Sequence, residues 1–374
     1  MGQPSPPLYK KVFSLVIAFL LIGEIMLFSA TGVLGLERFG SEFYYFSRHS
    51  AAVLAGIAIM IFVSRVRYQF WAKLSSFLVL VQVALVGLTL FSSFGHTAQG
   101  ASRWIKTPWL AFQPSELAKI TVTLYIARLL TLPQALKPGQ WLIRLAPIAV
   151  LLVLFLRQPD MGTTILVSAV ILGMLFIAGL RPVYFYTVLG SAIAVFAVTL
   201  MQSEYRRRRV FAFLNPWEDP QGAGFQSIQS FVSFHWGQLL GVGLGNGNSK
   251  LFFLPEVHTD FIFALIGEEL GFIGAFALLL LFAGFAYWMF KAALGAPDIL
   301  GRLLGFGISL ALVLQIAVNL GGVTGLLPLK GLPLPFISWG RSALLVNLFA
   351  MGILLNIIRQ SAILPPRPMN SAHA

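Results

Sequence analysis

The chain has 374 residues, of which 57% are hydrophobic and only 10% are charged, with no cysteine and a formal net charge of +13. Since soluble domains carry about 25% charged residues, this composition excludes a soluble globular protein and indicates a polytopic membrane protein. The lack of cysteine excludes disulfides, thiolate nucleophiles and thiolate metal sites.

Apolar runs long enough to cross a bilayer recur along the whole chain. The shortest of them is at 143–156, and that at 260–290 is long enough to be bent or tilted. An open sheet cannot span lipid, so a β-rich domain is excluded and the fold class is all-α, a polytopic integral membrane protein. We predict ten membrane helices, near residues 12–34, 49–64, 74–94, 115–132, 143–156, 162–180, 182–201, 260–290, 303–327 and 339–358.

Lys and Arg are most frequent in the segments that are cytoplasmic when the N-terminus lies inside, which predicts that both termini are cytoplasmic. Most carboxylates then lie on the outer side. We expect a single membrane domain over 1–364, with one large outer loop at about 202–259 and a disordered cytoplasmic tail at 365–374. The Trp and Phe residues of the outer loop argue against disorder there.

The net positive charge does not indicate a nucleic-acid partner, because the cytoplasmic basic residues are scattered and already follow from topology. The run of four arginines at 206–209 is different, since it lies in the predicted outer loop. A polyanionic ligand on the outer face would explain it.

The fourth predicted span opens with Gln113-Pro-Ser-Glu-Leu-Ala-Lys119, in which proline and a carboxylate both suit a helix start. Glu116 and Lys119 are three residues apart and share one helix face. They are interpreted either as a structural ion pair or as part of a pyrophosphate clamp. In the second case Lys119 and nearby Arg103 hold phosphate oxygens while Glu116 positions Lys119.

Several other polar residues have a structural and a functional interpretation. Asp160 caps the next helix or binds a metal, and His258 is a base, a metal ligand or a solvated loop side chain. The histidines are dispersed, so no metal site is assigned. The glycines at 241–247 follow no strand of a βαβ unit and favour tight turns over a dinucleotide loop. In the broken segment 331–342, Ser338 and Ser342 contact a ligand or satisfy freed backbone groups.

The segment 254–271 places Glu256, Asp260, Glu268 and Glu269 at the mouth of an apolar span. Carboxylates beside hydrocarbon are costly unless they face a cavity, a partner or a reaction, so they are functional candidates. On a helix, Asp260 and Glu268 fall near one face while Glu269 points to the other side. We therefore expect two acids stacked along a path into the membrane.

Six motifs in order carry a resemblance to a known family: Gly100-Ala-Ser-Arg-Trp-Ile105, Phe112-Gln-Pro-Ser-Glu-Leu-Ala-Lys119, Gln158-Pro-Asp-Met-Gly-Thr163, Gly222-Ala-Gly-Phe-Gln-Ser-Ile-Gln-Ser230, Leu254-Pro-Glu-Val-His-Thr-Asp-Phe-Ile-Phe263 and Gly331-Leu-Pro-Leu-Pro-Phe-Ile-Ser338. With them the chain resembles the SEDS family, the FtsW/RodA peptidoglycan glycosyltransferases of shape, elongation, division and sporulation. The segments Leu240-Gly-Val-Gly-Leu-Gly-Asn246 and Leu327-Pro-Leu-Lys-Gly-Leu-Pro333 favour the FtsW branch. Two positions depart from the family pattern, Trp339 and Arg341, and so does the segment 233–238.

The resemblance implies ten membrane helices in the bacterial cytoplasmic membrane and lipid II as the substrate. It implies a class B penicillin-binding transpeptidase and other divisome or elongasome membrane proteins as partners. It also implies that Asp260 is essential and that Arg103, Glu116 and Lys119 match functionally important positions. No organic cofactor is expected, and a divalent cation, Mg²⁺ or Mn²⁺, is an optional participant.

The hypothesis for the mechanism makes Asp260 the catalytic base, with Glu256 or Glu268 nearby to raise its pKa by like-charge repulsion. Arg103, Lys119 and Arg209 would neutralise a departing pyrophosphate. The alternatives are a lipid II flippase, whose polar residues should occur at both membrane depths, and a non-catalytic scaffold of the cell-wall synthesis complex. The concentration of acids and arginines on one side favours the glycosyltransferase.

Overall fold

The structure is a computed structural model that describes residues 7–91, 95–98, 101–106, 111–132, 138–179, 182–202, 204–329 and 331–363. Helices account for most of these residues, so the predicted all-α class is confirmed. A small antiparallel sheet was not predicted. The expected tail, 365–374, lies outside the described residues, as does Lys330.

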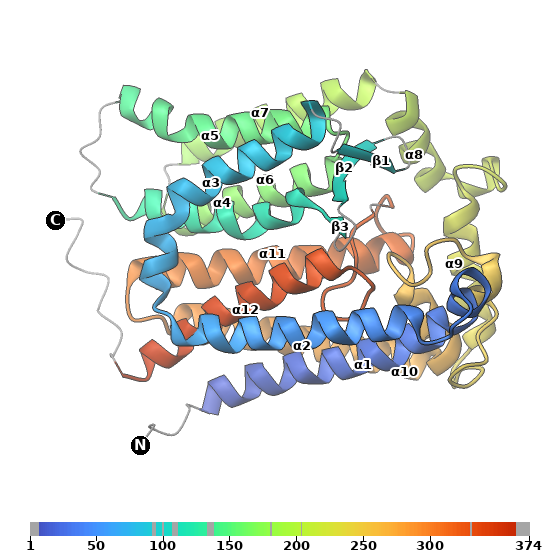
Figure 1. Cartoon of the computed structure of the whole chain (residues 1–374). Coiled ribbons are helices and arrows are strands. Elements are labelled where there is room, and N and C mark those ends of the chain that lie inside the picture. The colour runs from blue at the N-terminus through green and yellow to red at the C-terminus, as the bar shows by residue number, and fades with distance from the viewer. Residues whose placement is uncertain are drawn as a thin grey trace.

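Ten long helices among the described residues run along the molecule and alternate in direction (Figure 1). Each overlaps one of the ten predicted spans. The first turn of α1 and the last turn of α12 lie at the same end of the bundle. These helices are α1 (Pro7–Phe39), α2 (Tyr44–Arg65), α3 (Tyr68–Phe91), α4 (Pro114–Leu130), α5 (Pro138–Arg157), α6 (Met161–Ile177), α7 (Pro182–Met201), α10 (Ile262–Leu294), α11 (Ile299–Val323) and α12 (Arg341–Ser361).

Within the described residues, six helices are long and apolar enough to cross a membrane: α1, α2, α3, α10, α11 and α12. Helix α6 and residues 185–201 of α7 are apolar but shorter. Helix α4 has 17 residues and carries Glu116, Lys119 and Arg128, which lower its hydropathy. The chain is a multi-pass membrane protein, and the count of ten spans stays a prediction.

Helices α4, α11 and α12 form the interior of the bundle, where α11 packs against α4, α6, α10 and α12. Lipid tails are as apolar as helix surfaces, so close packing and interhelical hydrogen bonds hold such bundles together. Asn356 on α12 is an example: it accepts from Tyr68 N at 2.9 Å and donates to Ser64 O at 2.8 Å. This buried amide fastens α12 to the α2–α3 connection.

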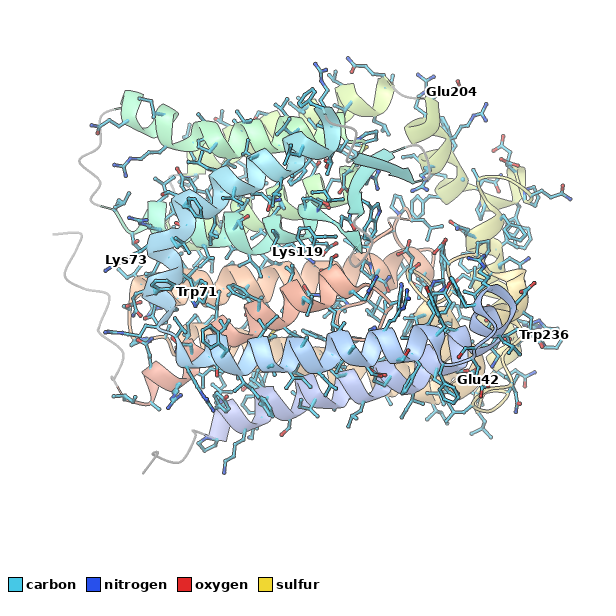
Figure 2. The ribbon with its side chains drawn as sticks, in the orientation of Figure 1. Glu42, Trp71, Lys73, Lys119, Glu204 and Trp236 are labelled. Atoms are coloured by element: carbon cyan, nitrogen blue, oxygen red, sulfur yellow. The ribbon has the colours of Figure 1, made fainter. Side chains whose placement is uncertain are left out.

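The end of the bundle at which α10 begins, called here the α8–α9 end, carries the extramembrane elements. Within the range of the predicted loop 202–259, the structure has helix α8 (Glu204–Leu214), a 3₁₀ turn (Pro216–Glu218), helix α9 (Phe225–Gly237) and a π turn (Ser249–Phe253). The sheet, β1 (Gly95–Ala98), β2 (Ala101–Lys106) and β3 (Ala111–Phe112), connects α3 to α4 at this end. Glu204 and Trp236 lie here, and Lys73 lies at the opposite end (Figure 2).

Helix α10 is bent at Gly271, whose φ of +68° interrupts the helical backbone. The segment after α9 fills the break: Phe272 N donates to Gln238 O at 2.8 Å and Val242 N to Glu268 O at 3.0 Å. A Cβ atom on Gly271 would lie 2.3 Å from Gly241 N, so only glycine permits this approach. Of the two expectations for this span, bent or tilted, the structure shows a bend, and the glycines at 241–247 serve turns and close packing.

Candidate active site

Asp260 lies in the turn that precedes α10, outside the helix. The backbone N–H groups of Thr259 and Asp260 donate to Glu256 O at 3.1 and 3.2 Å and close the turn. Glu256 itself has a φ of +56°, a region that residues other than glycine rarely adopt. Asn319 on α11 donates from Nδ2 to Asp260 O at 2.8 Å. The turn is thus fixed both by its own backbone and by α11.

A cavity of about 760 Å³ adjoins this turn, bounded by parts of α4, α6, α7, α8, α11 and the segment before α12. Sites for small molecules and cofactors usually measure about 300–1,000 Å³. Five residues that the sequence analysis selected line it together, Asp260, Glu256, Arg103, Glu116 and Arg209. A set of charged groups from distant parts of the chain therefore converges on one space.

The carboxyl group of Asp260 is partly exposed to the cavity and otherwise surrounded by protein. Burial is the main reason that the pKa of Asp260 rises to about 7, and the negative charge of Glu256 acts in the same direction. The positive charge of Arg209 opposes this rise. Because its pKa lies near neutrality, Asp260 can exchange a proton at physiological pH, as a general acid or base must.

Arg103 on β2 reaches the cavity while its guanidinium is held by backbone carbonyls. Its Nε donates to Gln158 O at 3.2 Å and its Nη2 to Pro159 O at 2.5 Å. Asp160 follows directly and caps α6, since it accepts from Thr163 N at 3.2 Å and from Thr163 Oγ1 at 2.9 Å. Of the two interpretations of Asp160, the structure supports the helix cap.

Glu116 and Lys119 form the expected ion pair on α4, with Lys119 Nζ 2.6 Å from Glu116 Oε2 and both side chains buried. Lys119 also donates to Gln315 Oε1 at 2.6 Å and to Asn347 Oδ1 at 3.3 Å. Figure 2 shows it inside the bundle. Glu116 lines the cavity, and Lys119 lies behind it among protein oxygens rather than on the wall. A direct phosphate contact by Lys119 stays a prediction.

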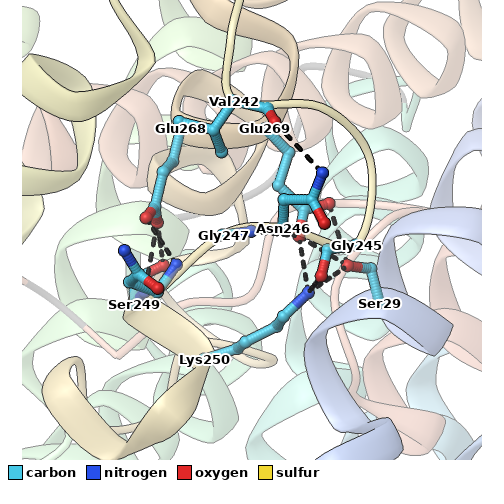
Figure 3. A network of polar contacts seen from close by, with 10 residues as sticks. Ser29, Val242, Gly245, Asn246, Gly247, Ser249, Lys250, Glu268 and Glu269 are labelled. Carbon is cyan, nitrogen blue, oxygen red and sulfur yellow. Dashed lines mark hydrogen bonds and ion pairs between the residues drawn. The ribbon is translucent and has the colours of Figure 1, made fainter.

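Glu268 lies apart from Asp260, and the expected stacking of the two acids is wrong. Asp260 precedes the first turn of α10, while Glu268 accepts hydrogen bonds from Asn248 N at 2.6 Å, from Ser249 N at 3.2 Å and from Ser249 Oγ. Figure 3 shows Glu268 and Glu269 engaged with the segment 245–250, and neither side chain lines the cavity. The packing of that segment against α10 explains the difference.

Glu269 belongs to the same network, which includes a lysine that the sequence analysis did not select. Lys250 Nζ lies 2.9 Å from Glu269 Oε1 and also donates to Gly245 O and to Ser29 Oγ. Ser29 on α1 donates to both Glu269 oxygens, at 2.6 and 2.8 Å (Figure 3). This buried pair therefore joins α1, α10, the π turn and the segment before it.

Neutral amides inside apolar spans are the other residues that sequence reasoning missed. Gln315 and Asn319 stand four residues apart in α11, and both are buried. Asn347 on α12 is a third. A polar side chain within an apolar run is itself a sign of a functional or structural contact, but the sequence analysis considered only charged residues there.

The broken segment before α12 forms one wall of the cavity. Ser338 Oγ accepts from Leu334 N at 2.9 Å and Ser342 Oγ from Gln113 N at 3.2 Å, contacts that favour the interpretation that they satisfy freed backbone groups. Trp339 and Arg341, the two departures from the family pattern, line the cavity with Tyr45. The Trp339 ring lies 5.2 Å from that of Tyr45, edge to face.

His258 stands beside Asp260 in the same turn and also lines the cavity. Burial lowers the pKa of His258, an effect that Glu256 opposes and Arg38 reinforces. Burial thus favours the neutral form of the imidazole, which contributes a hydrogen-bonding ring to the cavity.

Comparisons with known proteins agree over nearly the full length of the chain. The family model described as "Cell cycle protein", which covers FtsW, RodA and SpoVE, matches residues 9–363. The chain is 42% identical over 350 residues to the "Probable peptidoglycan glycosyltransferase FtsW" of Geobacter metallireducens, covering 92% of this chain and 93% of that protein. It is 36% identical over 363 residues to the stage V sporulation protein E of Bacillus subtilis, covering 96% and 98%.

The fold has a solved counterpart as well. A chain in the structure of a peptidoglycan synthase complex that coordinates polymerization and crosslinking superposes with a TM-score of 0.76 and 27% identity, over 94% of this chain and 97% of that chain. Sequence family and fold thus point the same way, and the FtsW branch is supported by the names of the relatives. The chain belongs to the FtsW/RodA/SpoVE family of cell cycle proteins.

Proposed function

We propose that this protein is a peptidoglycan glycosyltransferase that polymerises lipid II into glycan strands at the outer face of the cytoplasmic membrane. The observation that carries the proposal is the position of Asp260, a carboxyl group with a pKa of about 7 on the wall of a cavity that also presents Arg103 and Arg209. The names of its relatives support the same reaction class.

The reaction joins the 4-hydroxyl of one sugar to C1 of a second sugar that carries a lipid pyrophosphate. The hydroxyl oxygen attacks C1, and the bond between C1 and the pyrophosphate oxygen breaks. Asp260 takes the hydroxyl proton, and the pyrophosphate leaves with the bonding electron pair. No covalent enzyme intermediate is needed, so the configuration at C1 inverts.

The leaving pyrophosphate needs positive charge, which the cavity offers through Arg103 and Arg209. Lys119 acts behind them by holding Glu116, its partner at 2.6 Å. Glu256 helps to keep Asp260 basic through like-charge repulsion. We assign Glu268 no contact with substrate, because its oxygens are engaged by the 248–249 segment.

A divalent cation, Mg²⁺ or Mn²⁺, is left outside these steps. Within the described part of the chain, no group of three His, Asp or Glu side chains could hold a metal ion. We route no step through a cation.

The setting of this activity is also a proposal. We infer that both termini are cytoplasmic, which puts the α8–α9 end and the cavity outside. We expect a class B penicillin-binding transpeptidase to crosslink the strands, together with other divisome or elongasome membrane proteins. The match to FtsW proteins favours a role in cell division.

The test is polymerisation of purified lipid II by the full chain, alone and with a candidate transpeptidase. Loss of a general base typically costs about 10²–10⁴-fold in rate, so Asp260→Asn should remove most activity. Asp298→Asn is the matched control, because Asp298 caps α11 at the opposite end, where it accepts from Gly301 N at 2.6 Å and interacts with Tyr68, and it does not line the cavity.

Polymerisation by Asp260→Asn at the rate of the Asp298→Asn control would refute Asp260 as the base. Failure of folded wild type to polymerise, with partner and divalent cations present, would transfer support to a flippase or a scaffold. Transfer of labelled lipid II across vesicles, unchanged by Asp260→Asn, would then identify the flippase.

A further inference from the structure

Two carboxamides on α11 hold the segment that faces Asp260. Gln315 Nε2 donates to Pro333 O at 2.7 Å, and Asn319 Nδ2 donates to Leu332 O at 2.8 Å. Because Gln315 and Asn319 are four residues apart, they project from one face of the helix. Both side chains are at most 2% exposed, and the bond from Asn319 to Leu332 O is buried.

The same two amides also contact residues outside this segment. Asn319 Nδ2 also donates to Asp260 O at 2.8 Å. Gln315 Oε1 accepts from Lys119 Nζ at 2.6 Å, the lysine paired with Glu116. One face of α11 therefore connects the Glu116–Lys119 pair on α4, the Leu332–Pro333 backbone and the Asp260 turn.

The held segment lies close against the Asp260 carboxyl group. A Cβ atom on Gly331 would lie 3.0 Å from Asp260 Oδ2. On the other side, Leu334 N donates to Ser338 Oγ at 2.9 Å, which closes the segment on itself. Movement of this segment would change how much water reaches the carboxyl group.

We propose that Gln315 and Asn319 are positioning residues that fix the Asp260 carboxyl group and its enclosure relative to the Glu116–Lys119 pair. The inference rests on the proposed function in one respect, that Asp260 is the base. Neither amide reacts. Their donors are used by backbone carbonyls, so they act on catalysis through the groups that they hold.

The pH dependence of the rate reports on this role, because enclosure of the carboxyl group raises its pKa. The charged or titratable groups around it are Glu256 and His258 in its own turn and Arg209 on α8. Elsewhere on the cavity wall are Tyr45, Arg103, Glu116, Asp160 and Arg341. Loss of an amide adds or removes no charge among them. A shift of the acid limb therefore reports a change in enclosure.

The test uses Asn319→Leu and Gln315→Met, which approximately keep side-chain volume and remove the donors. The matched control is Asn356→Leu, which deletes a buried amide linking helices far from the cavity. For each folded full-length variant, kcat, KM for lipid II and the pH dependence of kcat/KM are measured. Detergent-solubilised melting temperatures quantify structural loss.

We expect Asn319→Leu to lower kcat by about ten- to hundredfold, as small misplacements of reacting groups do, with little change in KM. Its acid limb should move to lower pH, because water reaches the carboxyl group. Gln315→Met should act in the same direction but less, since it holds Pro333 and not Asp260. The Asn356→Leu control should lose melting temperature and keep the wild-type pH profile.

An unshifted acid limb in both cavity variants, with losses no larger than in the control, would overturn the positioning role. If Asn319→Leu does not fold, the result for Gln315→Met decides. The variant Asp260→Asn distinguishes a failure of the proposed base from a failure of the positioning role. Full activity of that variant refutes the proposed base, whereas its inactivity together with wild-type profiles for the amide variants refutes only the positioning role.

Discussion

The segment 254–271 carries its four acids in two different surroundings. Glu256 and Asp260 face an open cavity, where burial and the charge of Glu256, opposed by Arg209, raise the pKa of the Asp260 carboxyl group to about 7. Glu268 and Glu269, two turns into α10, face a closed network of Ser29, Lys250 and backbone N–H groups. Acids of the same chemistry, a few residues apart, are left reactive in one place and fully engaged in the other.

The difference shows that the surroundings of a carboxyl group decide whether it serves catalysis or holds the fold together. Hydrogen bonds and an ion pair occupy the carboxylate oxygens of Glu268 and Glu269 and tie these side chains to the protein. A catalytic base needs oxygens that a substrate can reach and a charge that can be gained and lost near neutral pH. In this segment, the carboxylates beside the membrane therefore have their oxygens either occupied by hydrogen bonds from the protein or open to a substrate.

The largest test of this comparison is Lys250→Met, which leaves Glu269 without its cation. Removing one partner of a buried pair typically costs about 3–5 kcal/mol, so we expect a large fall in melting temperature. The double variant Lys250→Met/Glu269→Gln should recover part of this loss, because no unpaired charge remains. Thermal unfolding in detergent measures both.

Polymerisation per folded molecule should stay near wild type in the double variant, since Lys250 and Glu269 do not line the cavity. A double variant that melts normally but has lost polymerisation would show that the closed network takes part in the reaction. That result would refute the division of the four acids into a structural pair, Glu268 and Glu269, and a pair that serves the reaction.

The sequence predicted most of the helices, because long apolar runs and their separations determine where a chain can cross lipid. The Glu116–Lys119 pair was also predictable, since helical spacing alone places residues i and i+3 together. That Arg103, Glu116, Arg209 and Asp260 act together was a hypothesis for the mechanism, based partly on family resemblance, and no spacing in the sequence predicted that they meet at one cavity. Contacts between segments so far apart leave no spacing signal in one sequence.

The false expectation for Glu268 has a specific cause. Helical periodicity was extended back to Asp260, although the helix begins only at Ile262. The partners of Glu268 come from 248–249, a segment whose approach depends on the bend at Gly271 and the turn at Gly241. A single sequence shows where the glycines are, but it does not show which backbone segment packs closely against each of them.

A smaller effect tests the electrostatics of the cavity. If Asp260 is the base, its ionised form is active, so kcat/KM should fall about tenfold per pH unit below about pH 7. Glu256→Gln removes a charge that raises the pKa of Asp260, so its acid limb should move to lower pH. Arg209→Gln removes a charge that lowers this pKa, so its limb should move to higher pH.

Arg208→Gln is the control for both, because Arg208 is exposed and pairs with Glu204 at 2.8 Å. Its pH profile should match that of the wild type. Shifts of Glu256→Gln and Arg209→Gln in the same direction would contradict Asp260 as the titrating base, since the two charges act on it with opposite sign.

The smallest expected effect comes from one methyl group. In Gly331→Ala the new Cβ would lie 3.0 Å from Asp260 Oδ2, so the carboxyl group or the segment must shift by a few tenths of an ångström. Because misplacement by about 1 Å can cost about 10²-fold, we expect a loss of about three- to tenfold in kcat. Gly284→Ala on α10 is the control, with nothing within 4 Å of its Cβ position. Equal rates for the two variants would mean that the reaction tolerates movement of the Asp260 carboxyl group. The exact position of Asp260 would then not distinguish it from the acids of the closed network.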